Sequence, residues 1–113
     1  MHELGITQSL VEIAENTARS NGAEKVLSVS VSVGELAGVV PEAMEFAFDV
    51  VTRGTLLEGA RLLIRRVPGR GRCSACGAES AMDRYTFTCP ACGEPTLERL
   101  QGDELKITEL EIE

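Results

Sequence analysis

The sequence contains no tryptophan, one tyrosine, three phenylalanines and a single histidine. A hydrophobic core must therefore be built mainly from Val, Leu, Ile and Ala. A chain of 113 residues also has limited apolar area to bury. We expect apolar packing to be supplemented by some other means of stabilisation, because so small a core leaves little margin.

The chain also lacks an excess of positive charge and any long apolar run. Its 11 Lys and Arg residues against 18 Asp and Glu residues give a net charge of -7, which repels nucleic-acid phosphates. Neither a signal-peptide pattern nor a stretch of about 18 apolar residues occurs, so we predict no membrane span. These features predict a cytoplasmic protein, and in a reducing compartment cysteines favour metal binding over disulfides.

Apolar residues at a spacing of three and four predict two helices. The first starts near Ile6 and stops at Ser20-Asn21-Gly22, and the second begins at Pro41, which suits the first turn of a helix. The predicted buried stripe of the first helix comprises Ile6, Leu10, Ile13, Ala14, Thr17 and Ala18. That of the second comprises Val40, Ala43, Met44, Ala47, Phe48 and Val51.

Alternating apolar residues predict three strands, at residues 27–33, 60–67 and 105–112. We predict an α+β fold in which two helices pack on a small mixed sheet of about three strands. Residues 69–101 contain all four cysteines and few large apolar residues. The predicted domains are therefore residues 1–68 plus 102–113, and an inserted four-cysteine, zinc-ribbon-like module at 69–101.

The four cysteines form two C-x2-C pairs, Cys73 with Cys76 and Cys89 with Cys92, separated by twelve residues. Within each pair a short turn points backbone N–H groups at the first sulfur, and a glycine follows each pair. Four sulfurs make a closed tetrahedral site, typical of structural zinc, with no open position for a substrate water. A single iron uses the same ligand set, so the spacing leaves zinc and iron open.

Tyr85 and Phe87 lie between the two cysteine pairs and allow two interpretations. Aromatic residues in small zinc ribbons stack on bases in some proteins and fill a small core in others. Residues 69–101 contain four Arg and four acidic residues, so the module lacks a basic surface. We therefore favour core packing over base stacking.

The only histidine is His2. The α-amine of Met1, the backbone nitrogen and imidazole of His2 and the backbone nitrogen of Glu3 can form a planar set of nitrogen ligands. Such a set favours Ni(II) or Cu(II) over Mg(II) or Zn(II). The Glu3 carboxylate either adds an oxygen ligand or only favours the positive start of the first helix. A terminal histidine is more often an exposed residue without a metal.

Several segments together resemble the HypA/HybF family of hydrogenase nickel-incorporation proteins. They are the Met1-His2-Glu3 start before an amphipathic helix, the Val33-Gly34-Glu35-Leu36 strand end, the VPEAMEFAF stretch at 40–48 and the inserted paired cysteines. The resemblance spans essentially the whole chain. It implies a small α+β nickel domain with a zinc domain inserted before its last strand.

The resemblance also implies a function, a metallochaperone that carries Ni(II) to the large subunit of nickel–iron hydrogenase with a HypB-type GTPase as partner. Carried over by position, Met1, His2 and Glu3 would bind nickel, and Cys73, Cys76, Cys89 and Cys92 would bind zinc. Nickel would be a transient cargo and zinc a structural ion. Some members of the family also support urease maturation.

Two other classes of function compete with the metallochaperone. The sequence has no nucleophile with a nearby base and no phosphate-binding glycine loop, so we predict that it is not an enzyme. A nucleic-acid-binding or protein-binding zinc ribbon is the stronger alternative, in which His2 would be dispensable. Residues 102–113 carry five acids and one lysine, and are either a docking surface or one solvated strand face.

Overall fold

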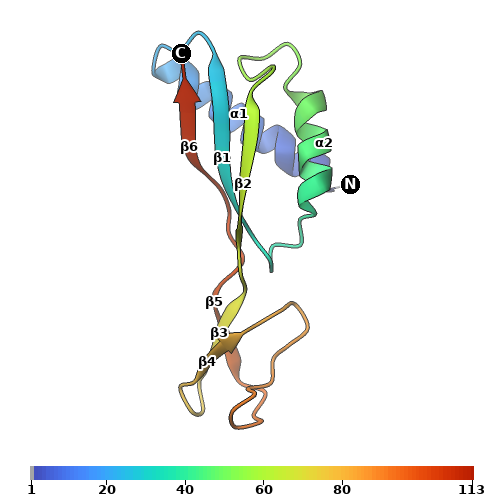
Figure 1. The fold of residues 1–113 in the computed structure, drawn as a ribbon, viewed down its shortest axis with the longest axis vertical. Helices are drawn as coiled ribbons and strands as arrows, with labels where there is room; N and C mark the ends of the chain where they lie inside the picture. The colour runs from blue at the N-terminus through green and yellow to red at the C-terminus, as the bar shows by residue number, and fades with distance from the viewer. Residues whose placement is uncertain (1) are drawn as a thin grey trace. The chain divides into compact units, whose positions relative to one another are not determined.

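A computed structural model describes residues 2–113, apart from the side chain of His2. The chain forms two helices and six strands (Figure 1). In chain order they are α1 (His2–Ser20), β1 (Val26–Gly34), α2 (Pro41–Val51), β2 (Arg61–Val67), β3 (Arg70–Cys73), β4 (Glu79–Ala81), β5 (Leu97–Gln101) and β6 (Leu105–Ile112).

The strands form two separate three-stranded sheets, with orders β2-β1-β6 and β4-β3-β5. In the first sheet β1 and β2 run in the same direction and β6 runs opposite to them (Figure 1). Lys25 and Glu113 exchange both of their backbone hydrogen bonds, which is the pattern of an antiparallel pair. The predicted α+β class, with two helices and a small mixed sheet, is confirmed.

The chain divides into two compact units. The first consists of the chain up to Ser32 together with Val39–Arg65 and Lys106–Glu113. The second consists of Val33–Gly38 and Arg66–Leu105. The second unit thus includes, besides the cysteine segment, a short piece of chain that follows β1.

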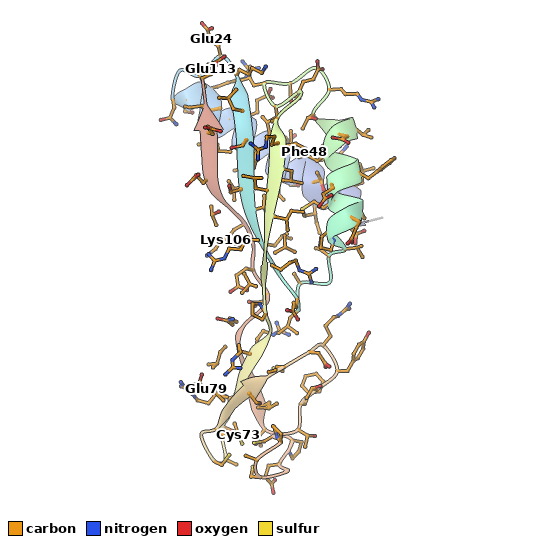
Figure 2. All side chains as sticks on the ribbon, viewed as in Figure 1. Glu24, Phe48, Cys73, Glu79, Lys106 and Glu113 are labelled. Carbon is orange, nitrogen blue, oxygen red and sulfur yellow. The ribbon has the colours of Figure 1, made fainter. Side chains whose placement is uncertain are left out.

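Both helices and the sheet contribute to the interior of the first unit. Only about 10 Å³ of space remains among the side chains at its centre, which include Val11 of α1, Val29 of β1 and Phe48 of α2 (Figure 2 labels Phe48). Such close packing is typical of a well-formed core. The buried apolar residues of this unit are Val11, Ala14, Ala18, Val26, Val29, Val31, Val39, Met44, Ala47, Phe48 and Leu57.

The buried stripe of α1 differs from the one that the sequence predicts. Ile13 is 55% exposed and Thr17 is exposed, whereas Thr7 and Val11 are buried. Thr7 tolerates burial because its hydroxyl donates to the Glu3 carbonyl. The predicted stripe is right at Ala14 and Ala18 and wrong at Ile13 and Thr17, because the buried side of the helix is rotated toward Thr7 and Val11. Val40 was also expected in the core and is exposed.

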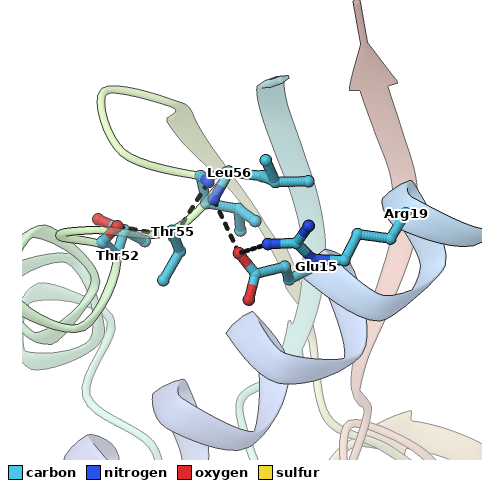
Figure 3. Close-up of polar contacts among 6 residues, drawn as sticks. Glu15, Arg19, Thr52, Thr55 and Leu56 are labelled. Atoms are coloured by element: carbon cyan, nitrogen blue, oxygen red, sulfur yellow. Dashed lines mark hydrogen bonds and ion pairs between the residues drawn. The ribbon is translucent and has the colours of Figure 1, made fainter. Parts of the chain in front are cut away.

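Glu15 of α1 connects the helix to the segment between α2 and β2 (Figure 3). Its Oε2 accepts the Leu56 N–H at 2.8 Å, and the Arg19 guanidinium lies 3.4 Å from the same oxygen. The Leu56 carbonyl in turn accepts the Val26 N–H at the start of β1. The Thr55 hydroxyl donates to the Thr52 carbonyl. This network satisfies backbone groups of a segment that has no regular secondary structure.

In the second unit, two backbone segments cross at positions that require glycine. A Cβ atom on Gly34 would lie 1.9 Å from the Gly102 carbonyl oxygen, and one on Gly102 would lie 2.7 Å from the Gly69 Cα. The Leu36 N–H donates to the Gly102 carbonyl. The crossing holds Val33–Gly38 against the chain at Gly69 and Gly102, which directly precede β3 and follow β5.

Candidate metal centre

The two cysteine pairs lie on two turns of the same construction. Cys73 ends β3, and the Gly77 N–H donates to its carbonyl at 2.8 Å. The Gly93 N–H donates to the Cys89 carbonyl at the same distance. Gly77 and Gly93 both have φ of +78°, a conformation that glycine adopts without strain. The glycine after each pair therefore reverses the chain around the sulfur atoms.

The four sulfur atoms lie within 4.8 Å of one another. The Cys73–Cys92 and Cys76–Cys89 Sγ distances are both 3.6 Å. A tetrahedron with metal–sulfur bonds of about 2.3 Å has sulfur–sulfur edges of about 3.8 Å. The site is thus close to the dimensions of a four-thiolate zinc centre, and its all-sulfur ligand set has the chemistry that zinc accepts.

Hydrogen bonds to the sulfur atoms favour thiolates at the first cysteine of each pair. A hydrogen bond from Thr96 and the Cys76 N–H lower the pKa of Cys73 to about 6. The Cys92 N–H is the main cause that lowers the pKa of Cys89. The expected contact between backbone N–H groups and the first sulfur is present, since the Cys76 nitrogen lies 3.4 Å from the Cys73 Sγ.

The second cysteine of each pair behaves in the opposite way. The Ala78 N–H lowers the pKa of Cys76, but the neighbouring Cys89 thiol and desolvation outweigh it, and the pKa is raised. The Glu94 N–H likewise lowers the pKa of Cys92, but desolvation and the surrounding thiols outweigh it and raise the pKa to about 12. Four thiolates repel one another, so full ionisation requires a bound cation.

Burial also differs between the first and second cysteines. Cys73 and Cys89 are buried, and Cys76 and Cys92 are exposed (Figure 2 labels Cys73). The buried pair packs with Met82 and Leu97 in a cluster that Ala78 borders. The site is thus anchored on one side by the small core of the unit and open to solvent on the other.

Thr96 is a residue of the site that the sequence does not indicate. Its hydroxyl lies 3.1 Å from the Cys73 Sγ, and its carbonyl accepts the Ser74 N–H. Hydrogen bonds to ligand atoms orient them and adjust their basicity. No local pattern identifies this threonine, because 23 residues separate it from Cys73 in the chain.

The aromatic residues between the cysteine pairs do not form the core of the module, and the prediction that they do is wrong. Tyr85 is 83% exposed and Phe87 is 54% exposed. Met82 and Leu97 occupy the core instead. In the same loop the carboxylate of Asp83 accepts the Tyr85 N–H and the Thr86 hydroxyl.

Of the predicted nickel ligands, Met1 and the His2 side chain are outside the described residues, and α1 begins at His2. Glu3 is described, and its carboxylate accepts the Val40 N–H at 3.3 Å. Val40 is the N-cap of α2 and has no side-chain cap of its own. The Glu3 carboxylate therefore also supports the N-terminus of the second helix.

A family model described as hydrogenase/urease nickel incorporation, metallochaperone, hypA matches residues 1–112. The chain belongs to the HypA family. The hydrogenase maturation factor HypA of Geobacter metallireducens is 53% identical over the whole length of both chains, and that of Geobacter sulfurreducens is 50% identical over the same extent. A relative with the same name from Trichodesmium erythraeum is 43% identical over all of this chain and 96% of its own.

Two solution structures of HypA proteins share the fold. The Ni metallochaperone HypA from Helicobacter pylori is 23% identical, with a TM-score of 0.68 over 97% of this chain and 96% of that one. A second HypA protein is 24% identical, with a TM-score of 0.73 over 99% and 96% of the two chains. Both support the α+β architecture.

Membership of the HypA family decides the class of function. HypA proteins are metallochaperones for nickel incorporation and not enzymes, as the sequence predicts for this chain. Among the described residues, neither helix has the length and apolarity that a membrane crossing requires. Within residues 3–113, the side chains that come close enough together to hold a metal ion are those of the four cysteines.

Proposed function

We propose that this HypA protein is a nickel metallochaperone that binds Ni(II) at its N-terminus and helps to insert it into the large subunit of nickel–iron hydrogenase. The ligands are the Met1 amine, the backbone nitrogen and imidazole of His2 and the backbone nitrogen of Glu3. A HypB-type GTPase is the partner in this step. The match to the HypA family over residues 1–112, which includes the Met1-His2-Glu3 start, carries the proposal.

The start of α1 supports a site made from backbone nitrogens. The helix begins at His2. The first four N–H groups of an α-helix have no acceptor within the helix, so helix formation does not use the nitrogens that the metal needs. The carboxylate of Glu3 contacts the N-cap of α2, which favours the backbone of Glu3, rather than its side chain, as the contribution to the metal site.

The four cysteines hold a structural zinc ion in the same proposal. The sulfur spacing and the two glycine turns fit a closed tetrahedral centre, which lacks an open position for exchange. Residues 69–101 are then a zinc module inserted into a nickel domain of residues 1–68 and 102–113. Zinc maintains the shape of the module, whereas nickel is cargo that must leave.

Metal analysis of protein purified with its natural N-terminus tests both sites. We expect one tightly held zinc and, after addition of nickel, one more weakly held nickel per chain. Adding one residue before Met1 removes the terminal amine from the chelate, so nickel affinity falls sharply while zinc content stays the same. Adding one residue after Glu113 is the matched control. Undiminished nickel affinity in the N-terminally extended protein contradicts the nickel site.

A second candidate function is supported by the exposed aromatic loop. Tyr85 and Phe87 face solvent, and the Arg84 guanidinium lies 5.9 Å from the centre of the Tyr85 ring. Such a surface suits a zinc ribbon that binds a protein or nucleic acid. His2→Ala separates the two candidates. Nickel transfer and hydrogenase maturation fail if the metallochaperone proposal is right, and neither changes if the ribbon surface is the active part.

A further inference from the structure

Helix α2 has a second apolar stripe that the first unit does not bury. Its inward side consists of Met44, Ala47 and Phe48. Ala43, Phe46 and Val50 follow one another at i, i+3 and i+7 on a neighbouring side of the helix. Phe46 is 75% exposed and Val50 is 43% exposed. A helix of a globular protein normally has one apolar stripe, so the second one indicates a further contact.

The second stripe borders a groove between α1 and α2. One hollow of about 450 Å³ is lined by Glu3, Leu4, Ala43, Phe46, Ala47 and Val50. A second hollow of about 610 Å³ shares Leu4 and Val50 with it and continues along α1 past Gln8, Glu12 and Glu15. The two hollows thus form one surface, which we call the α1–α2 groove. Its length along the two helices suits an elongated ligand.

Negative charge follows the apolar stripe along the same helix. Glu42, Glu45 and Asp49 have the same i, i+3 and i+7 spacing as the stripe, and all three are exposed. Residues 3–18 and 40–52 contain no Lys or Arg. The ion pairs found in the described part of the chain do not involve these three acids. These three carboxylates are therefore available to pair with positively charged groups of a ligand.

We propose that the α1–α2 groove is a docking surface for an amphipathic, basic helix of a partner protein. The apolar residues of that helix contact Phe46 and Val50, and its Lys or Arg residues pair with Glu42, Glu45 and Asp49. Recognition of this kind places an apolar helix face in a groove, while flanking charges fix its orientation and speed association.

The charges select this occupant over two others. A second copy of the chain that used the same surface would bring its own carboxylates beside the stripe, because residues 3–18 and 40–52 contain no Lys or Arg. An anionic bilayer would be repelled by the same three acids. A basic helix is the occupant that satisfies both the apolar stripe and the acidic one.

A synthetic amphipathic peptide of 18 residues, composed of leucine and lysine, is the probe for this surface. It is titrated into the full zinc-loaded chain, and binding is followed by fluorescence anisotropy and by NMR shifts of the protein. We expect binding with shifts confined to α1 and α2. A peptide with glutamate in place of lysine is expected to bind at least about tenfold more weakly, since its charges face like charges.

Protein variants then locate the site. The double variant Phe46→Gln/Val50→Gln is expected to weaken binding about tenfold or more, because it removes both exposed anchors. Leu63→Gln changes an exposed apolar residue of β2 outside the groove and is the matched control, with no expected effect. Glu42→Gln/Glu45→Gln/Asp49→Asn is expected to weaken binding and to flatten its salt dependence.

Several outcomes overturn the proposal. Equal affinity of the leucine–glutamate peptide, unchanged binding by Phe46→Gln/Val50→Gln, or shifts outside α1 and α2 each contradict it. Sedimentation that shows a dimer abolished by the double variant assigns the groove to a second copy instead. Adsorption to phosphatidylglycerol vesicles that the double variant abolishes assigns it to a membrane. Circular dichroism and zinc content confirm that each variant remains folded.

Discussion

The two units of this protein are held together in different ways. The first unit has a core of Val, Ala, Met, Phe and Leu side chains from both helices, β1 and the segment before β2. The cluster around the cysteines has only Met82 and Leu97 besides the two buried cysteines, with Ala78 at its border. The first unit therefore depends on apolar burial, whereas the cysteine cluster has few apolar side chains around it, and we expect it to depend on a bound metal ion.

Loss of a cysteine ligand is expected to affect the two units most differently. Structural zinc supplies binding free energy on the order of 10 kcal/mol, so we expect Cys89→Ser to lose zinc and to unfold residues 66–105. NMR spectra are expected to lose the dispersed signals of that unit and to keep those of α1 and α2. Ser74→Ala, an exposed change beside the site, is the control and retains zinc. Retained dispersion in zinc-free Cys89→Ser contradicts this expectation.

The opposite test removes apolar packing from the first unit. Met44 is fully buried, so Met44→Ala is expected to lower the free energy of unfolding by about 2–5 kcal/mol without loss of zinc. Val50→Ala on the exposed side of the same helix is the control, expected within about 0.5 kcal/mol of the parent protein. Urea denaturation followed by helical circular dichroism measures both. Equal effects of the two changes would show that the helix is not packed as described.

The pH dependence of zinc affinity sharpens the account of the cysteine centre. The raised pKa values of Cys76 and Cys92 keep both thiols protonated at pH 7 in the metal-free protein, whereas Cys73, with a pKa of about 6, is mostly ionised. Zinc binding therefore releases at least two protons at pH 7, and affinity rises about hundredfold per pH unit.

Zinc affinity rises with pH throughout this range, but the steepness of the rise depends on pH. Below pH 6 Cys73 is protonated as well, so a further proton is released on binding and the slope becomes steeper. Calorimetric titration of zinc in buffers of different ionisation enthalpy counts the protons directly. A proton count that falls on acidification contradicts the assignment of the low pKa to Cys73.

The glycine crossing offers a smaller test within the second unit. In Gly34→Ala the new Cβ meets the Gly102 carbonyl, and we expect a loss of about 1–3 kcal/mol of stability. Gly5→Ala is the matched control, because nothing lies within 4 Å of a Cβ there and alanine raises helix propensity. It is expected to stabilise the protein slightly. Thermal unfolding of both variants checks the opposite signs, and a neutral Gly34→Ala rules out the close crossing.

The smallest expected effect concerns the support of an irregular segment in the first unit. Glu15→Gln weakens the bond to the Leu56 N–H and the contact with Arg19, and we expect a cost of about 1 kcal/mol. Glu12→Gln, on the exposed side of α1, is the control. Hydrogen exchange of the Leu56 amide is expected to speed up only in Glu15→Gln. Equal exchange in both variants shows that Glu15 does not hold this segment.

Much of the fold was predictable because its signals are local. The alternation of β1, the proline that opens α2 and the strand pattern of β6 each lie within ten residues or so of chain. The buried stripe of α1 was partly mispredicted, since Ile13 is exposed and Thr7 is buried. The Thr7 hydroxyl donates to the Glu3 carbonyl, which compensates for its loss of contact with water. Hydrophobicity ranks these two residues in the wrong order.

The two candidate sites differ in how far the sequence indicated them. The spacing of the cysteines predicted that their sulfurs would converge, and the structure brings all four within 4.8 Å. The nickel ligands at the N-terminus stay a prediction, because their assignment depends on family resemblance and the chemistry of a terminal amine. The role of Glu3 at the N-cap of α2 became visible only when both helices were in place.

By itself the sequence determined the two helices, the three strands of the first sheet, the cysteine turns and the membership of the HypA family, because each is encoded by residues that are close together or by order along the chain. Only the tertiary structure decided that Thr96 contacts Cys73, that Glu15 holds Leu56, and that Ile13 faces outward while Thr7 is buried. These contacts join residues far apart in the chain, or depend on the rotation of a helix about its axis, and periodicity alone does not specify either.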